Sequence, residues 1–432
     1  MTAGHTLCLP TWVTRRRILL LVTALASAAA ALIVLPAAPA SAGFRTFSHA
    51  TIAAPLGMDE APDGSLWFAN YGNDSIGRID PVTEVVTNFV DVGIDGPRSV
   101  SVAPNGVVWF TSSDNGRLGR IDGGVVSTFP AMTEVDDVEV AADGDIWVNA
   151  FTSTGQDIAR FDPSTGTLAQ GYTVPGFVGR MTPHPTDGMW FTSINNSFTD
   201  ARIRHVTEAG ALTGFTTGAV NDPTDLTMGP DGRLWFTSED NGLVSRMNPT
   251  TGAMTSFDHP QVVAPGEIVE GPGGDLWFTN QAGGRFGRVD PVTGAIVLYR
   301  DPTDTVQGPT GLALGGDGNL WYTRADGFVG TLELGTCDGR AVTVDLALGS
   351  RPTGAADVIR GTAGANTINA GGGNDVVCAL DGNDEVNGGT GGDRLFLGAG
   401  ADRADGGAGA DLCDGGRGRD TAVGCESRIA IP

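Results

Sequence analysis

Acidic residues recur at a fixed interval near the C-terminus of this chain. Seven Asp and one Asn follow one another nine residues apart: Asp357, Asn366, Asp375, Asp384, Asp393, Asp402, Asp411 and Asp420. Most have Gly two positions before them and a small or apolar residue two positions after them. Carboxylates are preferred ligands of hard cations such as calcium, and glycines let backbone carbonyls turn toward the same ion. The spacing therefore indicates a repeated cation site.

The nine-residue period also predicts which elements position these acids. If two nonapeptides make one turn of a coil, residues eighteen apart stack on the same edge, and the apolar residue after each Asp fills the interior. One edge then carries Asp357, Asp375, Asp393 and Asp411. The other carries Asp384, Asp402 and Asp420, with Asn366 as a weaker first member. We expect the seven Asp residues to bind calcium.

A flexible, disordered Gly/Asp-rich tail is the alternative interpretation of this segment. Strict phase over eight copies with a core position argues against it when calcium is bound, whereas carboxylate repulsion favours it without calcium. The G-G-x-G-x-D-x-U-x pattern resembles the haemolysin-type (RTX) calcium-binding repeats. That resemblance implies a parallel β-roll over residues 352–432.

A longer repeat precedes the nonapeptides. Seven of the eight Trp residues lie in phrases such as "GPDGRLWFTS" (229–238), at Trp67, Trp109, Trp147, Trp190, Trp235, Trp277 and Trp321. The spacing of 38 to 45 residues, with several short strands per unit, is typical of a β-propeller. Neighbouring blades cover both faces of each blade, so we expect these Trp residues to pack between blades rather than bind a ligand.

The ends of this repeat predict how the ring closes. The seventh unit lacks its fourth strand, and "GFRTF" at Gly43–Phe47 has the missing pattern. We expect it to pair as the outer strand of blade seven, which protects an open sheet edge. The predicted fold is all-β: a seven-bladed β-propeller over 43–335, a linker over 336–351 and the β-roll over 352–432.

The phrases "GPDGRLWFTS" and "NDSIGRIDP" together resemble the streptogramin B lyases (virginiamycin B lyase), over roughly residues 44–335. The resemblance implies a seven-bladed propeller and metal-assisted opening of a cyclic depsipeptide, with magnesium as cofactor if the propeller is catalytic. The family's chemistry rests on His residues that follow the inner-strand Pro, and on the Glu of a "WFTE" phrase. Here the matching positions are Gly266 and Thr310 for His, and Asn280 and Arg324 for Glu. The resemblance therefore carries the fold, and it does not carry the activity.

The start of each inner strand of a propeller faces the central channel. Residues ten or eleven positions before the Trp residues include Arg98, Asp136, Asp137, Arg180, Asp225 and Glu267. These charges at a channel mouth would bind a polar ligand, a sugar or a metal. The alternative is a solvated rim whose charges pair with one another, which is the commoner case for charged clusters.

The N-terminus has the pattern of an export signal. Arg15, Arg16 and Arg17 precede an apolar run, and Ala40-Ser41-Ala42 fits a cleavage site. We expect residues 1–42 to be a signal peptide and the protein to be secreted; a single membrane anchor is the alternative.

Cysteine use agrees with an oxidising compartment. Removal of the signal peptide removes Cys8 and leaves an even number, four, for which two disulfides are the default. We favour Cys337–Cys378 and Cys413–Cys425, the pairs nearest in sequence. A zinc site is the weaker alternative because no CxxC pair is present.

Charge narrows the choice of partners. The chain has 26 basic residues, all Arg, against 50 acidic ones, a net charge of −24, which argues against nucleic acid and anionic membranes. We expect calcium and an unknown extracellular ligand or small molecule as partners, and a monomer. Two hypotheses remain: a secreted calcium-binding protein with a ligand-binding propeller, or a lyase that opens a cyclic depsipeptide or lactone at a divergent metal-assisted site.

Overall fold

The structure is a computed structural model. It describes residues 43–130, 134–152, 155–174, 176–197, 199–218, 220–271, 274–300, 308–333, 335–338, 340–346 and 351–431. The expected signal peptide, residues 1–42, lies outside the described residues, as does Cys8. Among the described residues the structure is almost entirely β, and helix is limited to short 3-10 turns such as η2 (Tyr71–Asn73), η3 (Ser113–Asn115) and η5 (Gln281–Gly283).

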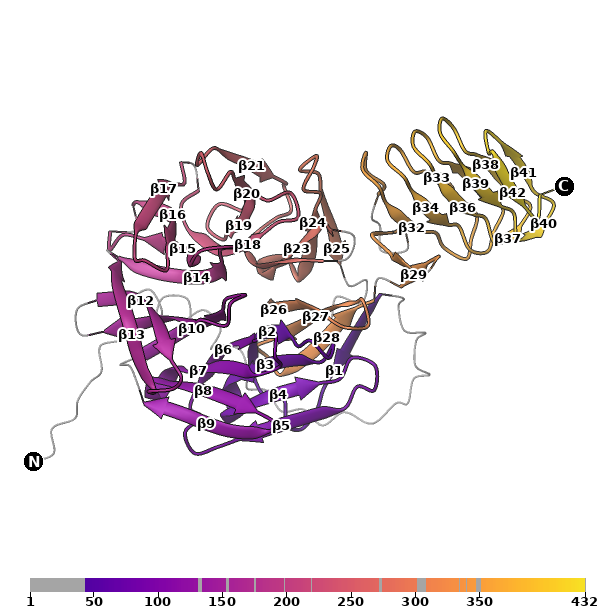
Figure 1. Cartoon of the computed structure of the whole chain (residues 1–432). Coiled ribbons are helices and arrows are strands. Elements are labelled where there is room, and N and C mark those ends of the chain that lie inside the picture. The colour runs from indigo at the N-terminus through magenta and orange to yellow at the C-terminus, as the bar shows by residue number, and fades with distance from the viewer. Residues whose placement is uncertain are drawn as a thin grey trace, which may run out of the picture. The chain divides into compact units, whose positions relative to one another are not determined.

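Seven antiparallel four-stranded sheets form the blades of a propeller, as predicted (Figure 1). Blade 1 is β2 (Pro55–Glu60), β3 (Leu66–Asn70), β4 (Ser75–Ile79) and β5 (Val86–Val90). Blade 2 is β6 (Pro97–Val102), β7 (Val108–Ser112), β8 (Arg117–Asp122) and β9 (Val125–Pro130). Blade 3 is β10 (Glu134–Val140), β11 (Ile146–Thr152), β12 (Gly155–Asp162) and β13 (Thr167–Val174). Blade 4 is β14 (Phe177–Pro183), β15 (Met189–Ile194), β16 (Ala201–Val206) and β17 (Leu212–Thr216). Blade 5 is β18 (Pro223–Met228), β19 (Leu234–Ser238), β20 (Leu243–Met247) and β21 (Met254–Asp258). Blade 6 is β22 (Pro265–Glu270), β23 (Leu276–Asn280), β24 (Arg285–Val289) and β25 (Ile296–Arg300).

Blade 7 contains strands from both ends of the propeller. It is built from β26 (Pro309–Leu314), β27 (Leu320–Arg324), β28 (Phe328–Leu332) and the N-terminal β1 (Phe44–Phe47). Phe44 pairs with Leu332 and Phe47 with Val329 in an antiparallel register. In Figure 1 the indigo β1 lies beside the orange strands of this blade. The expected closure of the ring by the N-terminal segment is therefore confirmed.

The repeated Trp residues are packing elements. Trp235 of blade 5 is fully buried in one apolar cluster with Leu276 and Phe278 of blade 6, and the other blades repeat this arrangement. The aromatic ring that follows most of these Trp residues also needs space beside the neighbouring strand. A Cβ at Gly287 would lie 1.9 Å from the ring of Phe278, so only glycine allows that ring to lie against the strand. The phrase is therefore architectural.

A parallel β-roll follows the propeller, as the nonapeptides predict. One sheet contains β31 (Val344–Asp345), β32 (Val358–Arg360), β34 (Val376–Cys378), β36 (Arg394–Phe396), β39 (Leu412–Asp414) and β42 (Ser427–Ile429). The other contains β33 (Thr367–Asn369), β35 (Glu385–Asn387), β38 (Arg403–Asp405) and β41 (Thr421–Val423). Shorter pairs are β29 (Thr336–Cys337) with β30 (Arg340–Ala341), and β37 (Ala399–Gly400) with β40 (Arg417–Gly418). The predicted core positions, from Ile359 to Ala422, form one buried cluster between the sheets.

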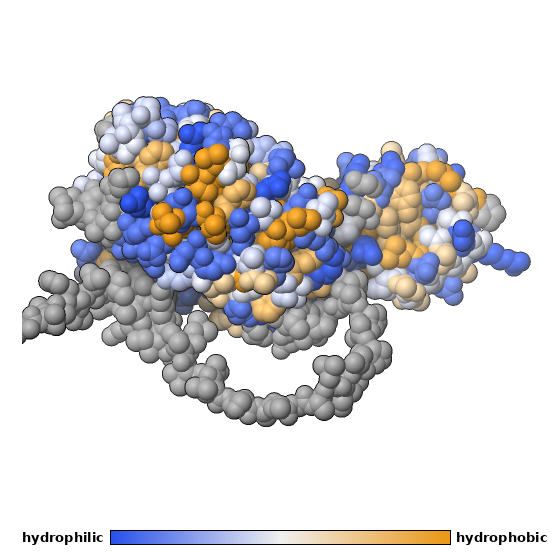
Figure 2. All heavy atoms as spheres, turned by 90° about the horizontal axis from the view of Figure 1, so that it is seen from below, coloured by the Kyte–Doolittle hydropathy of each residue, from blue (hydrophilic) through white to orange (hydrophobic). Residues whose placement is uncertain are grey.

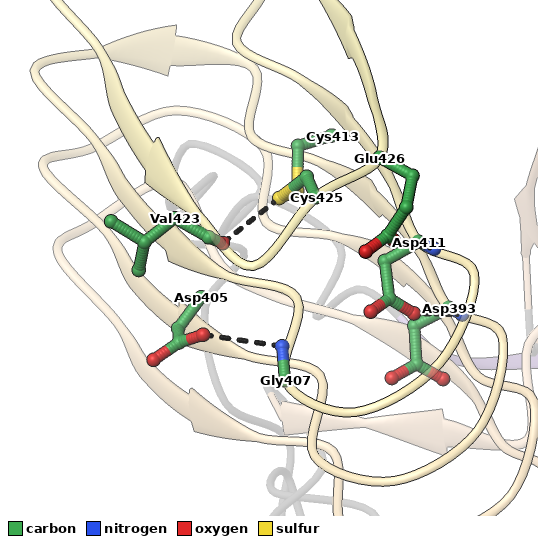
Figure 3. The surroundings of a disulfide bond; sticks show 8 residues. All are labelled: Asp393, Asp405, Gly407, Asp411, Cys413, Val423, Cys425 and Glu426. Atoms are coloured by element: carbon green, nitrogen blue, oxygen red, sulfur yellow. Dashed lines mark hydrogen bonds between the residues drawn. A yellow bond between two sulfur atoms is a disulfide. The ribbon is translucent and has the colours of Figure 1, made fainter.

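Two disulfides fasten the roll, and both expected pairings are confirmed. Cys337, in the segment that leaves the propeller, bonds to Cys378 of β34. Cys413, at a core position of β39, bonds to Cys425 near the C-terminus (Figure 3). Each bridge therefore holds one end of the coil.

Apolar side chains on the surface occur mainly as separate groups. Figure 2 shows them as patches among hydrophilic residues on the face viewed from below. Val82, Val85, Val90 and Val92 of blade 1 are the largest set of exposed apolar side chains close together in sequence. Isolated groups of this kind are normal on soluble domains, so they point to no partner.

Candidate functional site

The Asp residues of the roll form two ladders along its edges. On one edge the backbone N–H of Asp357 donates to Oδ1 of Asp375 (2.7 Å), that of Asp375 to Asp393 (2.9 Å), and that of Asp393 to Asp411 (2.8 Å). On the other edge Asn366 donates to Asp384 (2.7 Å), Asp384 to Asp402 (2.8 Å) and Asp402 to Asp420 (3.0 Å). Residues eighteen apart are thus neighbours on the same edge, as the period predicts.

Each ladder leaves a second carboxylate oxygen without a protein partner. The Oδ2 atoms are buried and accept no hydrogen bond in six residues: Asp375, Asp384, Asp393, Asp402, Asp411 and Asp420. All six side chains are at most 3% exposed. A buried carboxylate oxygen without a donor is costly, so a repeated set of them indicates that an ion supplies the missing partner.

Carbonyl oxygens converge with these free carboxylate oxygens. A Cβ added at Gly388 would lie 2.5 Å from Asp393 Oδ2 and 2.6 Å from the carbonyl of Gly406. At Gly406 the same test finds Asp411 Oδ2 at 2.9 Å and the carbonyl of Gly424 at 2.3 Å. Each glycine thus leaves room beside its Cα for a free carboxylate oxygen and a carbonyl oxygen, the two kinds of oxygen that bind calcium.

The glycines of the turns should tolerate no side chain. Gly391 has φ +129°, and a Cβ there would lie 1.6 Å from the carbonyl of Gly373 in the turn before. We expect Gly391→Ala to lower the free energy of unfolding of the calcium-loaded roll by at least ~2 kcal/mol. Urea denaturation followed by circular dichroism measures this.

Gly354 is the matched control, because a Cβ there meets nothing within 4 Å. Gly354→Ala should change the stability by less than ~0.5 kcal/mol. Equal stabilities of the two variants would contradict the tight stacking of the turns.

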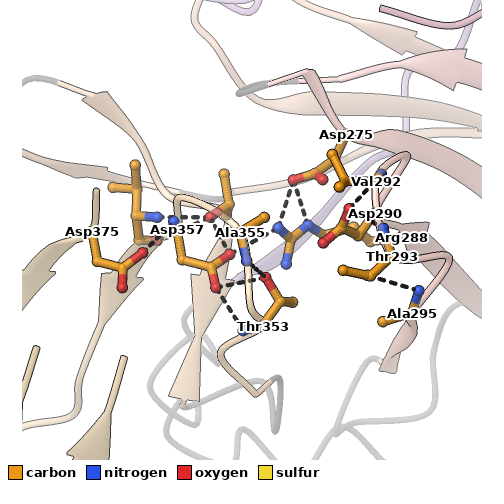
Figure 4. Close-up of polar contacts among 12 residues, drawn as sticks. Asp275, Arg288, Asp290, Val292, Thr293, Ala295, Thr353, Ala355, Asp357 and Asp375 are labelled. Carbon is orange, nitrogen blue, oxygen red and sulfur yellow. Dashed lines mark hydrogen bonds and ion pairs between the residues drawn. The ribbon is translucent and has the colours of Figure 1, made fainter. Parts of the chain in front are cut away.

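Asp357, although predicted as a calcium ligand, differs from the other six. Arg288 Nη2 donates to its Oδ1 at 3.0 Å, and the backbone N–H of Thr353 donates to its Oδ2 at 2.6 Å (Figure 4). Arg288 belongs to β24 of the propeller and also donates to Asp275 at 2.6 Å. A guanidinium thus lies at the propeller end of this ladder, and Asp357 has no free oxygen to offer a cation.

Burial and mutual repulsion act on the stacked acids. Burial raises the pKa of Asp375 to about 7, with the neighbouring Asp393 and Asp357 adding to the effect. Burial likewise raises the pKa of Asp384, Asp393 and Asp402. The next acid along the same edge raises each of these pKa values further. A divalent cation would offset both the cost of burying these carboxylates and their mutual repulsion. The free Oδ2 atoms are therefore suitable ligands for the predicted calcium ions.

A second cluster of acids lines the central channel of the propeller. The cavity has a volume of about 440 Å³ and is bordered by the inner strands of all seven blades. It brings together four of the predicted channel residues, Asp137, Arg180, Asp225 and Glu267. Arg180 donates to Asp137 at 2.9 Å, and Ile268 N–H donates to Asp225 Oδ2 at 2.8 Å.

Two predicted channel residues do not line this cavity. Arg98 pairs with Asp136 at 3.3 Å and with Asp114 at 3.4 Å. Asp136 lies in an irregularity of β10 between Val135 and Asp137, and its carboxylate pairs with Arg98. Conversely, sequence reasoning missed four acids that line the cavity: Asp59, Glu60, Glu139 and Glu270. Asp59 and Glu139 occupy the strand position two residues beyond the predicted ring, so period-two alternation would have indicated them.

Four acids of the channel, Asp59, Glu139, Asp225 and Glu267, hold protons more tightly than isolated carboxylates. Burial is the main cause and raises the pKa of both Asp59 and Asp225 to about 6, while Arg180 partly opposes the shift at Asp225. Burial also raises the pKa of Glu139 and Glu267, with neighbouring acids adding to it. Seven carboxylates thus line this cavity with one guanidinium, that of Arg180.

Known protein families match the propeller and the roll separately. The sequence profile of the virginiamycin B lyase family matches residues 134–376, which is more than half of the chain. The chain belongs to the virginiamycin B lyase family. The profile of the RTX calcium-binding nonapeptide repeat matches residues 387–422. The roll therefore carries calcium-binding repeats.

Solved structures share the propeller fold. A streptogramin B lyase superposes with a TM-score of 0.60 at 24% identity, over 68% of this chain and 99% of the other. Virginiamycin B lyase from Staphylococcus aureus gives 0.59 at 22% identity, over 67% and 98%. A catalytically inactive variant of that enzyme with quinupristin also gives 0.59, at 23% identity over the same shares. No protein of curated function matches in sequence.

The positions that match the histidines of the virginiamycin B lyase family serve other purposes here. A Cβ on Gly266 would lie 2.6 Å from Gln281 Nε2 and 2.7 Å from Thr279 Oγ1, so neighbouring side chains fill that space. Thr310 Oγ1 lies 3.0 Å from Thr323 Oγ1 and contacts the carbonyl of Pro55. Neither position offers an imidazole.

The positions that match the family's Glu are structural as well. Asn280 is buried and donates to the carbonyl of Gln261 at 2.8 Å. Arg324 pairs with Asp326 and covers the ring of Phe328. This group of residues does not fit a magnesium ion bound by carboxylates, so we derive no catalytic step through magnesium.

Two further clusters were not foreseen from sequence. Asp143, Asp145 and Glu208 bring their carboxylates within 4.8 Å of one another on the surface, and Arg160 pairs with Asp145. In blade 4 the rings of His184 and His205 lie 4.6 Å apart, and His205 stacks on Trp190. His205 covers the blade's Trp much as Arg246 covers Trp235 in blade 5. Both clusters join residues from separate strands or turns, which a repeat pattern does not reveal.

The channel acids should make stability depend on pH. Asp225 releases its proton near pH 4 in the unfolded chain and near pH 6 in the folded one. Its stabilising contribution is therefore complete below about pH 4 and is lost as the pH rises through about 6. We expect Asp225→Asn to exceed the wild type in unfolding free energy by about 1–2 kcal/mol at about pH 7.5, and by little at about pH 4.

Thermal unfolding across this pH range measures the difference. Glu270→Gln is the control, since it removes an exposed carboxylate at the end of the same channel wall and should leave the profile nearly parallel to the wild type. A constant difference between Asp225→Asn and wild type at every pH would contradict the assignment.

Proposed function

We propose that this protein is an exported calcium-binding protein whose propeller holds a small, positively charged ligand in its central channel. The observation that carries the calcium part is the set of six buried Asp Oδ2 atoms without a protein partner. We assign them as ligands, and we omit Asp357 because Arg288 and Thr353 engage both of its oxygens. Calcium, when bound, supplies the positive charge that these carboxylates face.

Export is supported by the pattern of residues 1–42 and by the two disulfides, which persist in oxidising compartments. Calcium is plentiful outside cells, where repeats of modest affinity are occupied. None of the described residues belongs to a helix long and apolar enough to cross a membrane.

The charge balance of the channel supports a cationic ligand. Seven carboxylates line the cavity with one guanidinium, and the raised pKa values of Asp59 and Asp225 favour a partner with positive charge. A bound cation would lower these pKa values and release protons near pH 6.

Calorimetry with spermidine and with manganese tests the channel. We expect binding to wild type whose heat depends on the ionisation enthalpy of the buffer, and weaker binding to Asp225→Asn combined with Glu267→Gln. Glu385→Gln, which removes an exposed carboxylate of β35 outside the channel, should bind like wild type. The absence of a heat for both probes at millimolar concentration would count against a cationic ligand.

A second candidate function is a lyase that uses channel carboxylates. A pKa near 6 at Asp225 suits a general acid or base at neutral pH, and the chain belongs to a lyase family. Chromatography of quinupristin incubated with the protein would detect ring opening. Turnover that disappears in Asp225→Asn supports this candidate, and an intact substrate with every added divalent metal opposes it.

A further inference from the structure

The first Asp ladder does not end on an Asp. The backbone N–H of Asp411 donates to Oε2 of Glu426 at 2.7 Å. Every earlier rung of this ladder is an Asp Oδ1 eighteen residues later, whereas Glu426 follows Asp411 by only fifteen. Glu426 therefore takes the place of a ladder Asp although it is out of phase with the nonapeptides and lies beyond the matched residues 387–422.

Strand pairing explains how a residue out of phase reaches this place. β42 pairs with β39 so that Ser427 lies beside Leu412 and Arg428 beside Cys413. Glu426 precedes β42 just as Asp411 precedes β39. The last turn is thus shortened by three residues, and the longer side chain of Glu reaches the amide that an Asp meets elsewhere.

The terminal loop also places a carbonyl near Asp411. A Cβ added at Gly406 would lie 2.3 Å from the carbonyl of Gly424 and 2.9 Å from the buried, unpartnered Oδ2 of Asp411, so both oxygens lie beside Gly406. This matches the arrangement at Gly388, where the oxygens come from Gly406 and Asp393. The last turn therefore places a carboxylate oxygen beside a carbonyl oxygen, as the regular turn before it does.

The disulfide holds this loop in position. Cys425 lies between Gly424 and Glu426 and bonds to Cys413 in the buried core of the roll (Figure 3). The disulfide at Cys425 thus lies between the residue that provides the carbonyl, Gly424, and the residue that provides the carboxylate, Glu426. The exposed Asp405 is drawn nearby, but its carboxylate accepts only from the local N–H of Gly407.

From this geometry we infer that Glu426 is the carboxylate of an additional, terminal calcium site, and that the Cys413–Cys425 disulfide holds Glu426 in that site. The site takes a hard divalent cation between Asp411, Glu426 and the Gly424 carbonyl. This inference rests on the proposed calcium binding by the roll and extends it beyond the nonapeptide repeats.

Calcium binding by the oxidised full chain tests the inference. Equilibrium dialysis with radioactive calcium gives the number of ions and their affinities, and hydrogen exchange of residues 406–429 reports the terminal turn. We expect Glu426→Gln to lose one ion or to bind it about 10–100-fold more weakly. Gln still accepts the Asp411 N–H, so the fold of the turn is kept while the charge is lost.

Asp405→Asn is the matched control, because it removes one acid from the same end of the roll without touching the ladder. It should bind as many ions as the wild type, with unchanged affinity. Cys413→Ser with Cys425→Ser keeps Glu426 but should show the same loss at the terminal site. Hydrogen exchange of residues 375–396 should stay protected in all variants and so report an intact roll.

The outcomes separate this inference from the proposed function. A wild type that binds no calcium overturns the proposed function itself. Wild-type binding with an equal number and affinity of ions in Glu426→Gln overturns only the terminal site. Normal calcium binding in the double Ser variant overturns the role of the disulfide.

Discussion

Removal of calcium is expected to unfold the β-roll while the propeller stays folded. A chelator should abolish the proteolytic and hydrogen-exchange protection of residues 352–431 and reduce the β signal in circular dichroism. Residues 43–333 should retain their protection wherever they are described, because their blades are held by apolar clusters rather than by ions.

The size of this effect follows from the stacked carboxylates. Six buried Asp residues lie on two edges, each beside another acid or beside Glu426, so without a cation they repel and lack partners. Calcium at about 100-fold above its dissociation constant adds about 2.7 kcal/mol of stability per site. Several sites together exceed the ~5–10 kcal/mol that stabilises a small domain.

Single substitutions should divide the roll's acids into two classes. Asp393→Asn, in the middle of a ladder, should raise the calcium concentration needed for folding several-fold. Glu385→Gln, on an exposed position of β35, should leave it unchanged. Protection of the roll that is identical with calcium and with chelator would contradict the prediction.

Replacement of Arg288 by Met is the second change with a large expected effect. Arg288 is 2% exposed and is the guanidinium that faces both Asp275 and Asp357. Removal of the cation would leave two buried carboxylates facing each other, and loss of one partner from a buried ion pair costs about 3–5 kcal/mol. We expect a loss of this size in the free energy of unfolding, measured with denaturant in saturating calcium.

Arg120 is the matched control. It occupies the same repeat position in blade 2, where it covers Trp109 and pairs with the exposed Asp122. Arg120→Met should cost less than ~1 kcal/mol. Adding Asp357→Asn to Arg288→Met should recover part of the stability, and a double variant no better than the single one would contradict the pairing.

The sequence predicts the architecture well because the period of each repeat can be read directly from its Trp or Asp residues. The spacing of Trp67 to Trp321 indicates seven blades, and the phase of Asp375 to Asp420 gives the two edges of the roll. The seventh unit, which lacks a fourth strand, likewise predicts the closing strand Phe44–Phe47. Pairing of the four cysteines by nearness in sequence predicts both disulfides.

The sequence does not reveal residues that act through contacts between the propeller and the roll. It also does not reveal residues that lie out of register with their repeat. Arg288 has the usual repeat position of a blade arginine, and only the fold brings it to Asp357, sixty-nine residues away. Asp59 lies two residues beyond the position on its strand that was expected to face the channel. Glu426 comes three residues earlier than the eighteen-residue period of the ladder requires. Such residues are found by strand register, which a period alone does not supply.

The pairing of β1 with β28 has a consequence for the order of events during synthesis. β1 finds its partner strand only after Leu332 has emerged from the ribosome or the export channel. Until then Phe44–Phe47 is an unpaired strand, and blade 7 presents an open edge. Ring closure is therefore a long-range step that we expect to come late in folding, and a chain cut short before residue 332 would lack part of its last blade.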